Sequence, residues 1–158
     1  MYCPVGKSRS GREVGILAIE QISVFMPEKA CLLWLTRLLG DNGVNIRALS
    51  IADTTDFGIL RLIVSEPARA EIVLGREGVT VTRTEVVAME VEDRPGGLAR
   101  ALTALEGARI GIEYLYGFVE KKEDRALIVL RVEEVAAAEK ALVRAGIRIL
   151  NPDDVRRL

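Results

Sequence analysis

The chain of 158 residues contains no histidine. Histidine is the usual base in Ser–His and Cys–His catalysis and a common ligand of zinc, iron and copper. Its absence argues against hydrolases of these types and against His-ligated metal centres. We therefore expect no metal site and no cofactor, and a protein that binds a small molecule without changing it is favoured over an enzyme.

Cysteine, aromatic residues and unbalanced charge are also scarce. The two cysteines, Cys3 and Cys31, form no CxxC motif, and such sparse use is typical of a reducing cytosol, which predicts a cytoplasmic protein. Lys and Arg number 22 against 23 acidic residues, so the net charge of −1 provides no broad positive field. Nucleic acids and anionic membranes are therefore not expected as partners. Aromatic residues make up 4% of the chain, so the core must consist mainly of aliphatic side chains.

Long hydrophobic runs are missing as well. The longest unbroken apolar run extends only from Ala30 to Leu35, whereas a membrane-spanning helix needs about 20 residues. The apolar run that follows the basic N-terminal residues ends at Ile19, which is too short for a signal peptide. Residues 1–15 show no periodicity and are rich in glycine and serine, so we predict a flexible tail there.

The sequence does contain an internal repeat, which relates residues 19–83 to residues 85–150. It is clearest in a helical stretch that recurs at an offset of 68 residues, where six residues match: Ala68, Ala70, Glu71, Leu74, Arg76 and Gly78 correspond to Ala136, Ala138, Glu139, Leu142, Arg144 and Gly146. Apolar residues that alternate over residues 22–26 and 87–91 predict a strand at the start of each copy. The chain therefore contains two copies of one structural unit.

Each copy has the pattern strand, helix, strand, strand, helix, strand, which predicts an α+β fold of two ferredoxin-like βαββαβ units. Right-handed crossovers place both helices on one face of each four-stranded antiparallel sheet. We expect unit 1 over residues 16–83, unit 2 over residues 84–150 and a C-terminal tail over residues 151–158. A unit of this size buries a small core, so the two units should pack together, either by sheet edge or by sheet face.

The candidate ligand-binding residues lie where the first strand of unit 2 meets its helix, Asp93-Arg94-Pro95-Gly96-Gly97-Leu98. Pro95 suits the first turn of a helix, and the two glycines leave the backbone open to a ligand. Unpaired N–H groups at a helix start attract a carboxylate. Asp93 either accepts bonds from an ammonium group or caps the helix. Asn45, at a strand start in unit 1, either binds the ligand through its amide or is a turn residue.

These segments resemble the ACT family of small regulatory domains, whose signature is Asp/Asn-x-Pro-Gly-x-Leu before a helix and Ile/Val-Asn-Ile at the next strand. Unit 2 matches the first part over residues 93–98, and unit 1 supplies Val44-Asn45-Ile46 for the second. Unit 1 has Lys29-Ala30-Cys31 where Pro-Gly is expected, which either argues against a second, equivalent site or provides Lys29 as a charge for the ligand carboxylate. Residues 51–58 and 114–118 are similar to stand-alone tandem ACT proteins of bacteria and archaea.

The resemblance implies a non-catalytic sensor that binds a free amino acid between two ACT units and regulates a partner. Its single site would comprise Asn45, Ile46, Asp93, Arg94, Pro95, Gly96, Gly97 and Leu98. The alternative is a regulatory small subunit of an amino-acid biosynthetic enzyme, such as an acetolactate-synthase-type complex, whose catalytic subunit would be the partner. Exposed edge strands favour a homodimer.

Two further features leave alternatives open. Tyr114, Tyr116 and Phe118 alternate on one strand, so they share one sheet face. They pack either in the core, in the seam between the units, or around a ligand with an apolar side chain. An RNA-binding sheet would need such aromatics among basic residues, and the charge balance speaks against it. The acidic residues Glu90 and Glu92 are best interpreted as the solvated face of a strand rather than as catalytic groups.

Overall fold

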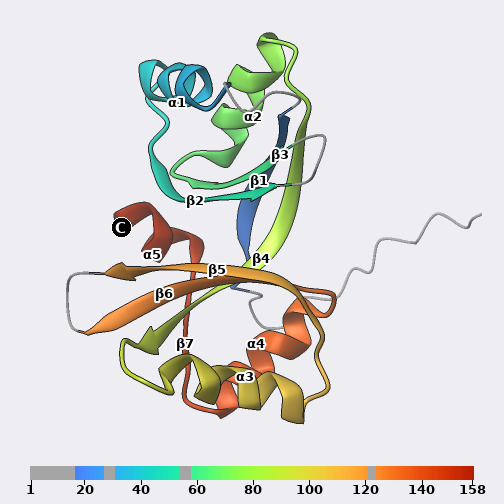
Figure 1. The fold of residues 1–158 in the computed structure, drawn as a ribbon, viewed down its shortest axis with the longest axis vertical. Helices are drawn as coiled ribbons and strands as arrows, with labels where there is room; N and C mark the ends of the chain where they lie inside the picture. Colours follow the sequence, from blue (N-terminus) through green and yellow to red (C-terminus); the bar gives the residue numbers. More distant parts are fainter. Residues whose placement is uncertain (1–16, 27–30, 54–57, 121–123) are drawn as a thin grey trace, which may run out of the picture.

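The computed structural model describes residues 17–26, 31–53, 58–120 and 124–158 (Figure 1). The predicted N-terminal tail, the Lys29-Ala30 departure from the ACT signature and most of the hairpin at residues 53–58 lie outside the described residues. The elements, in chain order, are β1 (Ile19–Met26), α1 (Leu32–Asp41), β2 (Ile46–Asp53), β3 (Gly58–Val64), α2 (Pro67–Arg76), β4 (Val81–Glu92), α3 (Gly97–Gly107), β5 (Ile112–Glu120), β6 (Arg125–Val132), α4 (Val135–Arg144), β7 (Arg148–Leu150) and α5 (Pro152–Arg157).

All strand pairs are antiparallel, and the strands run in the order β2-β3-β1-β4-β6-β5, with β7 also paired to β4. The first part of β4, Val81–Val86, pairs with β1, and the second part, Val87–Glu92, pairs with β6. Unit 1 therefore has the strand order β4-β1-β3-β2, and unit 2 has the order β7-β4-β6-β5. This confirms the α+β prediction of two ferredoxin-like units.

The strand β4 is the main difference from the expected pattern. We expected the last strand of unit 1 and the first strand of unit 2, over residues 87–91, to be separate elements. In the structure, β4 runs without a break from Val81 to Glu92. Thr82 and Thr84 lie opposite Ser23 and Gln21 of β1, so hydrogen bonding to β1 carries the strand across the polar stretch. The division between residues 83 and 84 stays a prediction and falls inside this strand.

The molecule has four layers, with the helix pairs outside and the sheets inside (Figure 1). The helices α1 and α2 pack on one sheet through a core that includes Ile22, Leu62 and Leu74. The helices α3 and α4 pack on the other through a core that includes Leu130 and Leu142. A third core lies between the sheets and consists of Ile19, Ala48, Ile63, Val86, Ala88, Leu127, Val129, Leu150 and Val155. Of the two arrangements left open, the units thus pack by sheet face.

The last eight residues, expected as a tail, instead contain the short helix α5. Asn151 and Asp154 form a capping box, in which each side chain accepts a hydrogen bond from the other residue's backbone N–H. Val155 is buried in the intersheet core. Capping and this apolar contact therefore hold the C-terminus against the sheets. Among the described residues, no helix combines the length and the apolar character needed to cross a bilayer.

Candidate functional site

The connection between β4 and α3 forms a tight turn that contains most of the predicted ligand-binding residues. The Arg94 N–H donates to the Glu92 carbonyl (2.9 Å), and the Gly97 N–H donates to the Arg94 carbonyl (2.9 Å). Gly96 occupies the N-cap of α3 with φ +88°, a left-handed conformation that favours glycine. Pro95 precedes the helix within this turn. The turn thus begins α3 without a capping side chain.

The two glycines have different roles in this turn. A Cβ atom at Gly97 would lie 2.0 Å from the Glu92 carbonyl oxygen, so this glycine allows α3 to pack closely on the end of β4. A Cβ atom at Gly96 would meet no atom within 4 Å. Gly96 therefore leaves open space beside the backbone, whereas Gly97 is buried and structural. Leu98 packs partly into the unit 2 core.

The start of α3 offers backbone donors to this open space. Within the described part of the chain, no acceptor is paired with the N–H groups of Leu98 and Ala99. Unpaired N–H groups in the first turn carry partial positive charge, which favours a bound carboxylate. The α3 N-cap also has no side-chain hydrogen bond. Asp93 therefore does not cap the helix, although capping was one of its two expected roles.

Two charged residues flank the turn. Asp93 is exposed, its backbone N–H donates to the Asp124 carbonyl (2.8 Å), and its carboxylate has no partner among the described residues. Arg94 is ion-paired with Glu92, and the hydrogen bond from Arg94, together with its charge, lowers the pKa of the Glu92 carboxyl. The Arg94 charge is thus compensated locally, while the Asp93 carboxylate remains available to a cationic group.

The unit 1 residues Asn45 and Ile46 lie elsewhere in the molecule. Asn45 directly precedes β2, its N–H donates to the Ser65 hydroxyl (3.0 Å), and its carbonyl accepts from the Ser65 N–H (2.9 Å). Its side-chain amide has no partner among the described residues. Ile46 packs against the unit 1 core. The amide is therefore available to a ligand, while the backbone is used in joining β2 to the end of β3.

The structure does not join these two groups of residues within one chain. The β4–α3 turn belongs to the lower unit in Figure 1 and the start of β2 to the upper unit, with β5, β6 and α5 between them. No hydrogen bond or ion pair of the described residues connects them. A single site that contains both Asn45 and Asp93 stays a prediction.

The tyrosines of β5 lie in the seam between the two sheets. The side-chain amide nitrogen of Gln21 in β1 donates to the Tyr114 hydroxyl (2.7 Å), and the Tyr116 hydroxyl donates to the side-chain oxygen Oε1 of Gln21 (2.9 Å). Gln21 is fully buried, and burial is the main reason that the pKa of Tyr116 is raised. Gln21 could not be recognised from the sequence, because an isolated polar residue in an alternating strand looks like a solvent-facing position. The Phe118 side chain lies outside the described residues.

The comparisons with known proteins agree with this architecture. The family model described as an ACT domain pair matches residues 17–158. Protein BT0572 from Bacteroides thetaiotaomicron is similar over 90% of this chain and 98% of its own, with 31% sequence identity and a TM-score of 0.85.

Two further structures have lower sequence identity to this chain, so their similarity shows only a shared fold. The ligand-free regulatory subunit of aspartate kinase from Thermus thermophilus is 16% identical over 80% of this chain and 91% of its own, with a TM-score of 0.57. The corresponding subunit from Thermus flavus is 15% identical over 80% and 92%, with a TM-score of 0.53. No curated protein sequence matches the chain. With its repeated βαββαβ units and a family match over nearly all of its length, the chain belongs to the ACT family as an ACT domain pair.

Proposed function

We propose that this ACT domain pair is a non-catalytic cytoplasmic sensor that binds a free amino acid at the β4–α3 turn and regulates a partner protein. One observation carries the proposal: the turn offers complementary groups for a zwitterion. The N–H groups of Leu98 and Ala99 suit an α-carboxylate, and the unpartnered Asp93 carboxylate suits an α-ammonium group. Open space at Gly96 gives the ligand access to the backbone between them.

A second copy of the chain would complete this site. Asn45 and Ile46 belong to unit 1, so an intermolecular contact offers a way to bring the Asn45 amide towards the β4–α3 turn. Two features support a homodimer. The strands β2 and β5 end the strand order, so each has an edge without a partner strand in the described chain. The β2 strand also exposes two large apolar side chains, Leu49 (47%) and Ile51 (46%).

The experiment is a thermal-shift screen of the full chain with each of the twenty amino acids, followed by calorimetry on those that bind. A ligand present at 100 times its Kd stabilises the fold by about 2.7 kcal/mol, which is readily measured. The Asp93→Asn variant should bind the ligand at least about tenfold more weakly, because one charge-assisted hydrogen bond becomes a neutral one. The Asn45→Ala variant should also bind more weakly if the second copy completes the site.

The matched control is Glu106→Gln, which makes the same change in charge near the far end of α3 and should leave the affinity unchanged. Light scattering with and without the ligand tests the dimer. The proposal fails if none of the twenty amino acids stabilises the chain, or if Asp93→Asn binds the ligand as tightly as the unaltered protein.

A further inference from the structure

A cavity of about 420 Å³ lies between the inner faces of the two sheets and shares no residue with the β4–α3 turn. We call it the intersheet crevice. Five strands contribute the polar side chains that line it, which are Ser23, Arg61, Thr82, Thr84, Glu113, Tyr114 and Arg131, and Thr80 just before β4 adds one more. Its volume falls within the range of small-molecule sites in proteins. The crevice therefore has the size and the polar lining of a binding site, although it lies between two units that otherwise meet through an apolar core.

The strand register explains why these polar residues gather in one place. On one sheet, Ser23 of β1 lies directly between Arg61 of β3 and Thr82 of β4. On the other sheet, Tyr114 of β5 lies opposite Arg131 of β6. Residues in directly opposed pairs project from the same face of a sheet. Two polar rows, one from each unit, thus line the same cavity.

The buried Gln21 turns the hydroxyl groups of the crevice into donors. Its amide nitrogen donates to both the Ser23 hydroxyl (3.2 Å) and the Tyr114 hydroxyl (2.7 Å), while its oxygen accepts from Tyr116 (2.9 Å). The hydroxyls of Ser23 and Tyr114 therefore act as acceptors towards Gln21, and each keeps its own hydrogen. Among the described residues no acceptor takes either hydrogen. Both can donate to a ligand in the crevice.

The arginines add positive charge to these donors. The Arg61 guanidinium carbon lies 3.9 Å from the centroid of the Tyr114 ring, so the group stacks on one face of the ring. Within the described chain, Arg61 has no carboxylate partner. Arg131 is held by the Glu113 carboxylate (3.7 Å) and by the Glu85 carbonyl, to which it donates (3.1 Å). Two guanidinium groups thus face one carboxylate, and Arg61 is the uncompensated charge.

We propose that the intersheet crevice binds a small organic oxyanion, a carboxylate or a phosphate, through Arg61 and the hydroxyl groups of Tyr114 and Ser23. The one carboxylate in the lining, Glu113, is ion-paired with Arg131, so the free hydroxyl donors and the uncompensated charge of Arg61 are complementary to an oxyanion and not to a neutral or cationic molecule. The walls come from both units, so a bound anion contacts β1 and β3 of unit 1 and β5 of unit 2 together. The proposal does not depend on the amino-acid site at the β4–α3 turn.

The test is an NMR titration of the ¹⁵N-labelled full chain at constant ionic strength with three probes: inorganic phosphate, succinate and succinamide. Succinamide has the length of succinate but no charge. We expect saturable shifts of the Ser23, Thr82 and Tyr114 amide signals with phosphate, succinate or both, and none with succinamide. A higher affinity for phosphate assigns the site to phosphorylated ligands, and a higher affinity for succinate assigns it to carboxylates.

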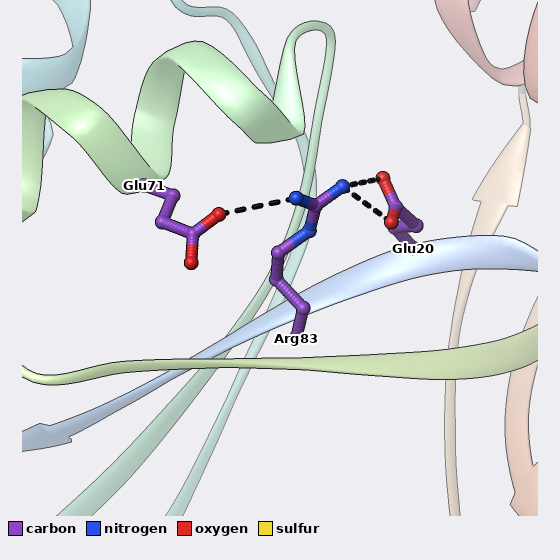
Figure 2. A network of polar contacts seen from close by, with 3 residues as sticks. All are labelled: Glu20, Glu71 and Arg83. Atoms are coloured by element: carbon purple, nitrogen blue, oxygen red, sulfur yellow. Dashed lines mark hydrogen bonds and ion pairs between the residues drawn. The ribbon is translucent and has the colours of Figure 1, made fainter.

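Two variants locate the binding groups. The Arg61→Gln variant should bind the preferred anion at least about tenfold more weakly, since it loses a charge-assisted contact. The Tyr114→Phe variant keeps the ring but lacks the donor, and should bind several-fold more weakly. The matched control is Arg83→Gln, which removes one positive charge from the same sheet. Arg83 projects from the opposite face, between Glu20 of β1 and Glu71 of α2 (Figure 2), so this variant should bind as the unaltered protein does.

Three results would overturn the proposal. The first is that neither anion gives saturable shifts, and the second is that the shifts appear at the β4–α3 turn instead of the crevice. The third is that Arg61→Gln and Arg83→Gln weaken binding equally. The last result would mean that the anion responds to net charge and not to the crevice.

Discussion

Replacement of Gln21 with methionine should lower the free energy of unfolding by about 2 kcal/mol. Gln21 is fully buried and makes three hydrogen bonds, two of them to the unit 2 tyrosines Tyr114 and Tyr116. Methionine has a similar length and no hydrogen-bonding amide. Ser23 and Tyr114 line the crevice, where water can replace the lost Gln21 donor. Loss of the hydrogen bonds to these two residues should therefore cost little free energy. Tyr116 packs against the intersheet core, and its hydroxyl would be left without an acceptor at a cost of about 1–3 kcal/mol.

The Tyr116→Phe variant isolates this bond. As a single change, Tyr116→Phe leaves the side-chain oxygen of Gln21 without its donor, which should cost about 1–2 kcal/mol. In the double variant neither group is left unpaired, so the combined loss should be smaller than the sum of the two single losses by about 1–2 kcal/mol.

The assay is equilibrium unfolding in urea of the unaltered protein, both single variants and the double variant, followed by circular dichroism. Strict additivity of the two losses would contradict the assignment of Gln21 and Tyr116 as a buried pair that joins the units. Two separate transitions in the unaltered protein would contradict the shared intersheet core.

Three more substitutions test other parts of the structure. Gly97→Ala should lower the free energy of unfolding by about 2–4 kcal/mol, because the new Cβ would lie 2.0 Å from the Glu92 carbonyl oxygen. Gly96→Ala should lower it by only about 1–2 kcal/mol, through left-handed backbone strain. Equal losses of stability in thermal melts would refute this contrast. Burial raises the pKa of the Glu139 carboxyl, so the folded chain binds this proton more tightly than the unfolded chain and stability falls as pH rises through the raised pKa. Glu139→Gln should remove this fall and melt at a higher temperature at pH 7, and a variant that follows the same pH dependence as the unaltered protein would refute the assignment.

The repeated units could be predicted because their signals are local. Matching residues such as Ala70 and Ala138, or Leu74 and Leu142, recur at one offset and lie on the buried faces of α2 and α4. The short helix α5 was missed although its signals are present, since Asn151 before Pro152 is a typical helix start. So short a helix also needs a tertiary contact, which the burial of Val155 between the sheets provides.

The candidate sites were less accessible to prediction, because they depend on contacts between distant residues. The turn at residues 93–98 has a recognisable sequence, yet the different roles of Gly96 and Gly97 depend on the position of the Glu92 carbonyl. Gln21 and Tyr114 are far apart in the chain, and nothing near either residue signals their hydrogen bond. The crevice exists only because two sheet faces meet, and the sequence left open whether faces or edges would do so.

The unbroken course of β4 has a mechanical consequence for any signal that passes between the units. A hinge needs a few residues that are free to change their backbone angles, but Val86 and Val87, where the units meet, are hydrogen-bonded parts of one strand. The two units therefore cannot move independently in the way that domains joined by a flexible linker do. An effector of the proposed kind would therefore act through the twist of β4 or through the association of copies, and not through a hinge between the units.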